Sequence, residues 1–217
     1  MGYPRLFEII RNAARLAALG EWREFNFRLR ILLGQIDLDF SSQADLNLPE
    51  EKCYDYADSG GLHLERILRD LDITSDDAII DIGSGKGGAL FTFSKYPFGR
   101  IAGCEISAEL IETARKNLAV MKVDNVELIM RDAVEFRELD DFNYIYFFNP
   151  FPGTVMREVI DNIVASLQRR PRRVTIIYFN PECHEVIVNE TPFVKLKEYQ
   201  QNALKYYLYS NPEQASA

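Results

Sequence analysis

Polar side chains lie at the ends of four short apolar segments in the middle of the chain: Asp81, Glu105, Asp132 and Asn149. A carboxylate within or beside an apolar run is costly unless it has a partner. Four glycines follow the first acid within six positions: Gly83, Gly85, Gly87 and Gly88. Glycine lets backbone approach a ligand closely beside a helix N-terminus. Glu105 stands twenty residues beyond Gly85, the spacing that puts an acid on a ribose hydroxyl pair. These residues predict a cofactor that contains a nucleoside.

The segments around these residues alternate between strand and helix patterns. Short runs rich in β-branched residues predict strands over 78–82, 100–105, 126–130, 144–148 and 174–179. Helical spacing predicts helices that begin near 89 and that cover 108–121 and 154–169. Such alternation is typical of a parallel sheet with right-handed crossovers and helices on both faces. Ligands bind such sheets at the carboxyl ends of the strands, where the strand order reverses. The four polar side chains are therefore expected to face one crevice.

The last part of the chain has a different pattern. Two strand-like runs, 193–199 and 204–209, are separated by only four residues. So short a link permits an antiparallel hairpin and excludes a helical crossover. The sequence thus predicts a mostly parallel sheet with an antiparallel C-terminal hairpin.

The first 61 residues are expected to form a helical extension with a substrate-side loop, followed by a cofactor-binding domain over 62–217. Amphipathic patterns predict helices over 4–19 and 21–34. Residues 1–33 hold six Arg against three Glu, a balance of +3. Basic helices of this kind could dock on RNA or a membrane surface, but a lid or packing helix with solvated cations is favoured. In the loop that follows, Tyr54 and Tyr56 beside glycines suit a binding rim, and a surface turn fits the pattern equally well.

Composition and charge exclude several other classes. The 217 residues are 47% hydrophobic and 27% charged, as in ordinary globular proteins, and the net charge is −8. This charge does not favour a large nucleic-acid footprint, although the basic N-terminal helices do not exclude one. The three cysteines have no zinc or disulfide spacing, which indicates no metal site and a cytoplasmic protein with reduced thiols. No apolar stretch approaches the length of a membrane span.

Two cofactor classes compete for the glycine segment. Gly83-x-Gly85-x-x-Gly88 formally matches the dinucleotide fingerprint, which keeps a nicotinamide-dependent oxidoreductase as an alternative. Asp81 opposes that interpretation, because a carboxylate beside the turn would repel a pyrophosphate but would suit a cationic or amino-bearing ligand. An ATP phosphate loop is excluded, because Lys86 lacks the Gly-Lys-Ser/Thr context.

At this point the residues resemble those of the class I S-adenosylmethionine-dependent methyltransferases. Asp81-Ile-Gly-Ser-Gly-Lys-Gly87 looks like the first motif of that family, Glu105 like the second and Asp132-Ala133 like the third. The Asn149-Pro-Phe segment looks like the fourth, and the C-terminal hairpin like strands 6 and 7. The resemblance covers about residues 60–210. It implies an α/β fold of three layers, doubly wound, with a seven-stranded sheet (a Rossmann-like methyltransferase fold).

The resemblance also implies roles for particular residues. Gly83 and Gly85 would approach the methionine portion of S-adenosylmethionine, with Asp81 near its amino group. Glu105 would take the ribose hydroxyls, and Asp132 with the backbone of Ala133 would read the adenine. The full cofactor-binding set expected from the motifs is Asp81, Gly83, Ser84, Gly85, Gly87, Glu105, Ile106, Asp132, Ala133 and Asn149. A non-catalytic module that only binds the cofactor remains a further alternative.

The acceptor is expected to meet Asn149, Pro150 and Phe151. Methyltransferases that act on planar amino nitrogens carry an Asn-Pro-Pro-Phe-type turn, whose Asn oxygen and proline carbonyl accept hydrogen bonds from the amine. Here the second proline is displaced by one position, which disfavours base methylation. The segment is also similar to the non-SET histone lysine methyltransferases and their small bacterial relatives. An amine or amide nitrogen on a protein or small molecule is therefore the preferred acceptor, with Phe151 and Tyr56 lining its pocket.

Overall fold

A single seven-stranded sheet organises the protein, seen in a computed structural model that describes residues 22–46, 53–54, 56–148, 150–201 and 204–212. The strand order is β3-β2-β1-β4-β5-β7-β6. Strands β1 to β5 run parallel, and β7 runs antiparallel to both β5 and β6. Their bounds are Ala78–Ile82 (β1), Arg100–Glu105 (β2), Val126–Met130 (β3), Tyr144–Phe148 (β4), Thr175–Phe179 (β5), Val194–Gln201 (β6) and Leu204–Ser210 (β7). The predicted fold class is confirmed, including the C-terminal hairpin.

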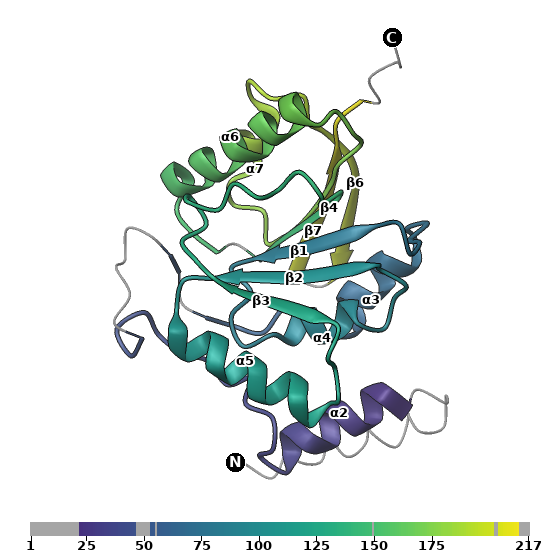
Figure 1. Ribbon diagram of the computed structural model, residues 1–217, viewed down its shortest axis with the longest axis vertical. Coiled ribbons are helices and arrows are strands. Elements are labelled where there is room, and N and C mark those ends of the chain that lie inside the picture. Colours follow the sequence, from purple (N-terminus) through teal and green to yellow (C-terminus); the bar gives the residue numbers. More distant parts are fainter. Residues whose placement is uncertain (1–21, 47–52, 55, 149, 202–203, 213–217) are drawn as a thin grey trace.

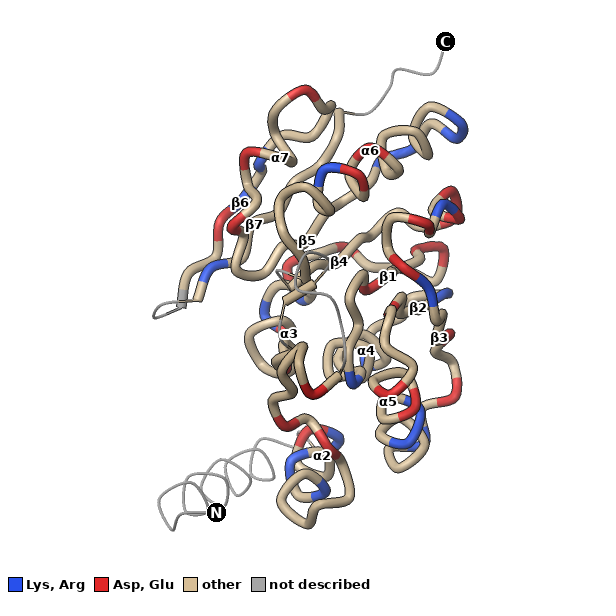
Figure 2. The backbone as a smooth tube through the Cα atoms, turned by 90° about the vertical axis from the view of Figure 1, so that its left-hand side faces the viewer, with Lys and Arg blue, Asp and Glu red and all other residues tan. Residues whose placement is uncertain are grey.

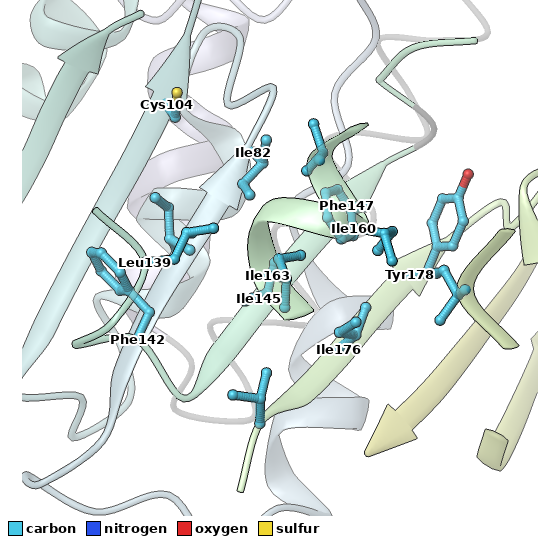
Figure 3. Close-up of a cluster of buried hydrophobic side chains, with 14 of the residues drawn as sticks. Ile82, Cys104, Leu139, Phe142, Ile145, Phe147, Ile160, Ile163, Ile176 and Tyr178 are labelled. Carbon is cyan, nitrogen blue, oxygen red and sulfur yellow. The ribbon is translucent and has the colours of Figure 1, made fainter. Parts of the chain in front are cut away.

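Helices cover both faces of this sheet (Figure 1). Their bounds are Trp22–Leu32 (α2), Leu62–Arg69 (α3), Gly88–Phe93 (α4), Ala108–Val120 (α5), Gly153–Arg169 (α6) and His184–Val188 (α7). Helix α6 packs on one face, where its Ile160 and Ile163 lie among Ile145 and Phe147 of β4 (Figure 3). Helices α2, α3 and α4 contribute to the apolar cluster on the opposite face. The short α7 is an element that the apolar pattern did not predict.

Helix α2 buries a different side from the one its pattern suggests. The apolar residues Trp22 and Leu33 are 64% and 61% exposed, whereas Phe27 is buried. Phe27 stacks on Phe91 of α4, with ring centroids 4.1 Å apart. A stacked aromatic pair stabilises the contact beyond its buried area. The side of α2 that packs on the rest of the protein therefore carries Phe27 and not Trp22. The helix expected over 4–19 lies outside the described residues.

A buried ion cluster fastens α2 to α3 and α4. Lys95 donates to Glu24 Oε2 at 2.5 Å and to Glu65 Oε1 at 2.6 Å. Both glutamates are almost completely buried. Arg28, on the same helix as Glu24, also forms an ion pair with it at 2.7 Å, and Arg69 forms one with Glu65 at 3.1 Å. Figure 2 shows acidic and basic segments side by side on α2. The buried Glu24 of α2 is thus neutralised by Lys95, which follows α4 and also pairs with Glu65 of α3.

The arginines at the end of α6 make contacts within the fold. Arg169 pairs with Asp140 at 2.6 Å, and Arg170 pairs with Asp141. Arg172 donates to the backbone carbonyls of Phe142 and Leu139. The ion pair with Arg169 lowers the pKa of Asp140 to about 2. These contacts tie the end of α6 to the segment before β4.

Residues 36–46, 53–54 and 56–61, here called the strap, lead from α2 to α3 across the carboxyl ends of the central strands. The strap has little regular structure, as predicted, but it is fixed by pairs of backbone hydrogen bonds. Ser41 and Tyr56 pair with each other as an isolated antiparallel bridge. The Tyr54 N–H donates to Pro150 O at 3.0 Å, and the Gly61 N–H donates to Thr92 Oγ1 at 2.9 Å.

None of the helices that the structure describes has the length and apolar character needed to cross a lipid bilayer.

Candidate functional site

One cleft opens at the carboxyl ends of the strands, beside β1, where the strand order reverses. It contains about 680 Å³ of space, part of it open to solvent. One side, here called the strand side, is formed by Gly83, Gly85, Cys104, Glu105, Ile106, Leu110, Arg131, Asp132 and Ala133. The other, the strap side, is formed by Leu46, Cys53, Tyr54, Tyr56, Ala57, Phe148, Pro150, Phe151 and Val155. The crevice expected from the strand ends is present.

The glycine turn between β1 and α4 forms the centre of the cleft. Gly83 and Gly85 have φ of +87° and +52°, which L side chains rarely adopt. A Cβ at Gly83 would stand 2.5 Å from Pro150 Cβ, and one at Gly85 would stand 2.2 Å from the Tyr56 ring. Both positions therefore require glycine for conformation and for space. Ser84 and Gly87, also predicted as binding residues, help to form the turn but are not among the residues that line the cleft.

Glu105 is held by the turn that it faces. Its Oε2 accepts the Gly85 N–H and its Oε1 accepts the Ser107 N–H, both at 2.9 Å. Burial raises the pKa of Glu105, while these backbone hydrogen bonds lower it. Each carboxylate oxygen can accept more than one hydrogen bond. Glu105 is thus a preorganised acceptor with capacity left for a ligand hydroxyl.

Asp81 is a buried carboxyl to which no described residue of the chain donates a hydrogen bond. It is 2% exposed. Burial, together with the negative charges of Glu105 and Asp58, raises its pKa well above the usual value. An acid in this position gains most from a ligand cation. The sequence placed a carboxylate beside the turn, and the structure adds that nothing in the described chain neutralises it.

The far end of the strand side contains the third predicted motif. Asp132 is half-buried, and its Oδ1 accepts the Val134 N–H at 3.0 Å. Ala133 and Ile106, expected from the motifs to bind the cofactor, line the cleft. Arg131, which the sequence reasoning did not select, also lines it, but its guanidinium pairs with Glu138 at 2.6 Å. The strand side therefore offers mainly acceptors and apolar surface.

Tyr56 lies over the glycine turn. Its ring edge contacts Gly85, and its hydroxyl is buried without a hydrogen-bond partner of regular geometry. Burial, and after it the negative charge of Asp58, raises the pKa of Tyr56, so the hydroxyl keeps its proton. The sequence assigned Tyr56 to an acceptor pocket. The structure places it on the strap side of the cleft, directly against the turn.

The strap side carries no formal charge among its described lining residues. Phe148, the last residue of β4, stacks on Phe179 at 4.4 Å, and Phe179 stacks on Tyr206 at 4.1 Å. This stack fixes the residue directly before Asn149, which itself lies outside the described residues. Pro150 and Phe151, expected to meet the acceptor, line the cleft, and the Pro150 carbonyl accepts the Tyr54 N–H. One lone pair of that carbonyl remains for a ligand.

Three of the lining residues that the sequence did not indicate come from the strap: Leu46, Cys53 and Ala57. Only the pair of tyrosines beside glycines marked this segment. Residues in irregular loops have no periodicity that indicates which side chains point inward. Cys104, Arg131 and Phe148 adjoin predicted residues in the sequence, whereas Leu110 and Val155 come from the helices α5 and α6 and had no such signal.

A family model described as "Methyltransferase domain" matches residues 73–209, more than half of the chain. The chain belongs to this family. The resemblance to the class I S-adenosylmethionine-dependent methyltransferases is thereby confirmed, and the expected enzyme class and cofactor agree with that family. The nicotinamide-dependent alternative is not favoured.

Two curated relatives match parts of this methyltransferase domain. It is 29% identical over 102 residues to an rRNA adenine N-6-methyltransferase of Limosilactobacillus reuteri, covering 47% of this chain and 40% of that protein. It is 31% identical over 109 residues to the uncharacterised protein RP028 of Rickettsia prowazekii, covering 47% and 42%. The chain spans less than half the length of these relatives.

A solved structure supports the fold. The RNA methyltransferase of Salinibacter ruber, determined in complex with S-adenosylhomocysteine, superposes with a TM-score of 0.56 at 19% identity. The match covers 74% of this chain and 97% of that one. At this identity the similarity establishes the architecture of the methyltransferase domain.

Replacing Glu105 with alanine is expected to weaken binding of S-adenosylhomocysteine by about 1–3 kcal/mol, because ribose hydroxyls would lose a charged acceptor. Titration calorimetry measures the change. Glu109→Ala, which removes an exposed carboxylate from the first turn of α5, is the matched control and should bind like the wild type. Equal affinities for Glu105→Ala and wild type would contradict the ribose assignment.

Proposed function

We propose that this methyltransferase domain transfers a methyl group from S-adenosylmethionine to an uncharged amine or amide nitrogen. The observation that carries the proposal is the division of the cleft. Its strand side has the carboxylates Glu105 and Asp132, with Asp81 buried beside the turn, while its strap side is aromatic and uncharged. A cationic nucleoside cofactor suits the first environment, and a neutral acceptor suits the second, because desolvating a charge there would be costly.

On the strand side, each residue has a role that its surroundings support. The Asp81 carboxylate would meet the ammonium group of the methionine portion, which supplies the missing cation. Glu105 would accept the ribose hydroxyls, because its oxygens are already fixed by Gly85 and Ser107. Asp132 and the backbone of Ala133 would contact the adenine, with Ile106 against its face.

On the strap side, the residues would orient the acceptor and exclude water. When bound, the cofactor supplies an electrophilic methyl group on a sulfonium whose leaving group is a neutral thioether. The chain must then mainly align the nitrogen lone pair with that methyl group, since alignment provides much of the rate enhancement in such steps. Phe148, held by its stack on Phe179, and Phe151 provide rigid apolar walls. The free lone pair of the Pro150 carbonyl and the Asn149 amide oxygen would accept the N–H groups of the acceptor.

A base amino group in RNA is the second candidate acceptor. The relative from Limosilactobacillus reuteri is an rRNA adenine N-6-methyltransferase, and such an amino group is a planar, uncharged nitrogen. The displaced proline of the Asn-Pro-Phe-Pro segment and the net charge of −8 favour a protein or small-molecule amine instead.

Two measurements test the proposal. S-adenosylhomocysteine should raise the thermal stability of the protein, whereas NAD and NADP should not, since a ligand stabilises the state that binds it. Cell extract incubated with methyl-labelled S-adenosylmethionine should then yield label in the protein or small-molecule fraction. Label in RNA would favour the second candidate. A non-catalytic binding module would bind the cofactor but transfer no label to any fraction. In that case Asn149→Ala would bind the cofactor like the wild type.

A further inference from the structure

Lys86 is a buried lysine inside the glycine turn, and the proposed reaction gives it no role. Its side chain is 7% exposed, and its Nζ donates to Asp37 Oδ1 at 2.9 Å and to the Asp39 carbonyl at 2.8 Å. A lysine is almost never so buried without partners. Its charge is directed at the strap, because both acceptors belong to strap residues.

The strap residues that Lys86 binds are connected through Ser41 and Tyr56 back to the glycine turn. Two residues after Asp39, Ser41 pairs with Tyr56 through N–H to O hydrogen bonds of 2.9 and 3.3 Å in the two directions. The Tyr56 ring lies against Gly85, the neighbour of Lys86 in the chain. Lys86 Nζ stands 5.3 Å from the centroid of that ring, a distance at which a cation is attracted to an aromatic face.

Asp37, a strap residue that binds Lys86, is also held by Asn117 of α5. Asn117 Nδ2 donates to Asp37 O at 2.7 Å and to Lys86 O at 3.0 Å, while its Oδ1 accepts the Asp37 N–H at 3.0 Å. The backbone of Asp37 is thus fixed beside the glycine turn independently of its carboxylate. The ion pair with Lys86 adds a link that joins the turn itself to the strap.

We propose that Lys86 is a positioning residue that holds the strap on the glycine turn, so that Tyr56 covers the cofactor and slows its release. This inference rests on the proposed cofactor site and identifies Lys86 as the residue that keeps the strap over that site. Because Gly85 contacts Tyr56 while Lys86 contacts Asp37 and Asp39, adjacent residues of one turn fasten both ends of the Ser41–Tyr56 bridge. Lys86 acts through the strap and not on the methyl group.

The principal test is the dissociation rate of S-adenosylhomocysteine, measured by stopped-flow displacement. Lys86→Met should raise the rate constant roughly tenfold, because a strap that has lost its ion pair with the turn would open more readily and let the ligand leave. Asp37→Asn should raise it by a smaller factor, since the Asp39 carbonyl still holds the lysine. The double variant should differ little from Lys86→Met, because both changes break the same link. Lys205→Met, at an exposed hairpin lysine, should leave the rate unchanged.

A second readout does not depend on the ligand. Hydrogen exchange of the Tyr56 amide, which donates to Ser41 O, should be faster in Lys86→Met and Asp37→Asn than in ligand-free wild type. Unchanged exchange and unchanged dissociation in Asp37→Asn would overturn the inference, even if Lys86→Met did not fold. A loss of thermal stability without faster dissociation would also overturn it. If wild type binds no S-adenosylhomocysteine, the proposed function fails, while exchange at Tyr56 still decides whether Lys86 holds the strap.

Discussion

Asp81→Asn is expected to weaken the binding of S-adenosylhomocysteine about a hundredfold and, at neutral pH, to make the ligand-free protein more stable. The first effect arises because the ammonium group of the ligand would lose a buried counter-charge, a change on the order of 3 kcal/mol. The second arises because Asp81 has no partner in the described chain and lies near Glu105 and Asp58. Asparagine keeps the shape and removes the repulsion.

The pH dependence separates these two effects. Burial raises the pKa of Asp81 above its value in the unfolded chain. The folded state therefore holds a proton that the unfolded state releases, and wild-type stability falls as pH rises from the ordinary value near 3.8 through the raised pKa. The stability advantage of Asp81→Asn should accordingly be small near pH 4 and grow toward neutral pH. In wild type, ligand affinity should decrease as pH falls through the same range, because only the ionised carboxylate attracts the cation.

Calorimetric titration and thermal unfolding between pH 4 and pH 8 provide both measurements. The control is Asp124→Asn, which removes an exposed carboxylate in the loop before β3 and should behave like wild type. A variant that binds as tightly as wild type would contradict the placement of the ammonium group at Asp81. A variant less stable than wild type at neutral pH would show that the carboxylate has a favourable partner in the folded protein.

Lys95→Met is expected to destabilise the fold by about 3 kcal/mol and to lower the melting temperature by roughly 6–12 °C. Lys95 is shared by Glu24 and Glu65, which are 1% and 3% exposed. Without it, two buried carboxylates would repel each other, and only Arg28 and Arg69 at the edge of the cluster would remain to balance them. Methionine retains the apolar contact with Phe91, over which the lysine lies at 4.5 Å.

Chemical denaturation monitored by circular dichroism measures this effect. The matched control is Lys116→Met, because Lys116 is 73% exposed and only 3.7 Å from Glu112 on the surface of α5. Surface pairs of this kind contribute 1 kcal/mol or less, roughly. A similar loss in both variants would show that the buried cluster contributes no more than an ordinary surface pair.

The same variant examines whether residues 22–61 and the rest of the chain unfold together. The sequence suggested a separate N-terminal extension that ends at residue 61. Helix α2 is joined to α3 and α4 by the Lys95 cluster and by the Phe27–Phe91 stack. We therefore expect a single cooperative transition in wild type. An early transition confined to α2 and the strap in Lys95→Met would support a boundary near residue 61.

The sequence by itself determined the sheet and the strand side of the cleft. Short apolar runs rich in β-branched residues favour strands, and the link of a few residues between the last two runs requires an antiparallel hairpin. Asp81, Glu105 and Asp132 could be assigned to one edge because each lies at or just beyond the carboxyl end of a parallel strand. These are local rules, in which the position of a residue along its own strand decides where it lies.

The tertiary structure alone decided the strap side and the partners of the buried charges. Tyr56 reaches Gly85, and Asp37 reaches Lys86, across 29 and 49 residues of chain that have no periodicity to indicate the contact. Glu24 has the pattern of a solvated residue on a basic helix, yet it is buried because Lys95 lies opposite it. A charged side chain can be buried only when its partner is in place, and packing supplies that partner from a distant part of the sequence.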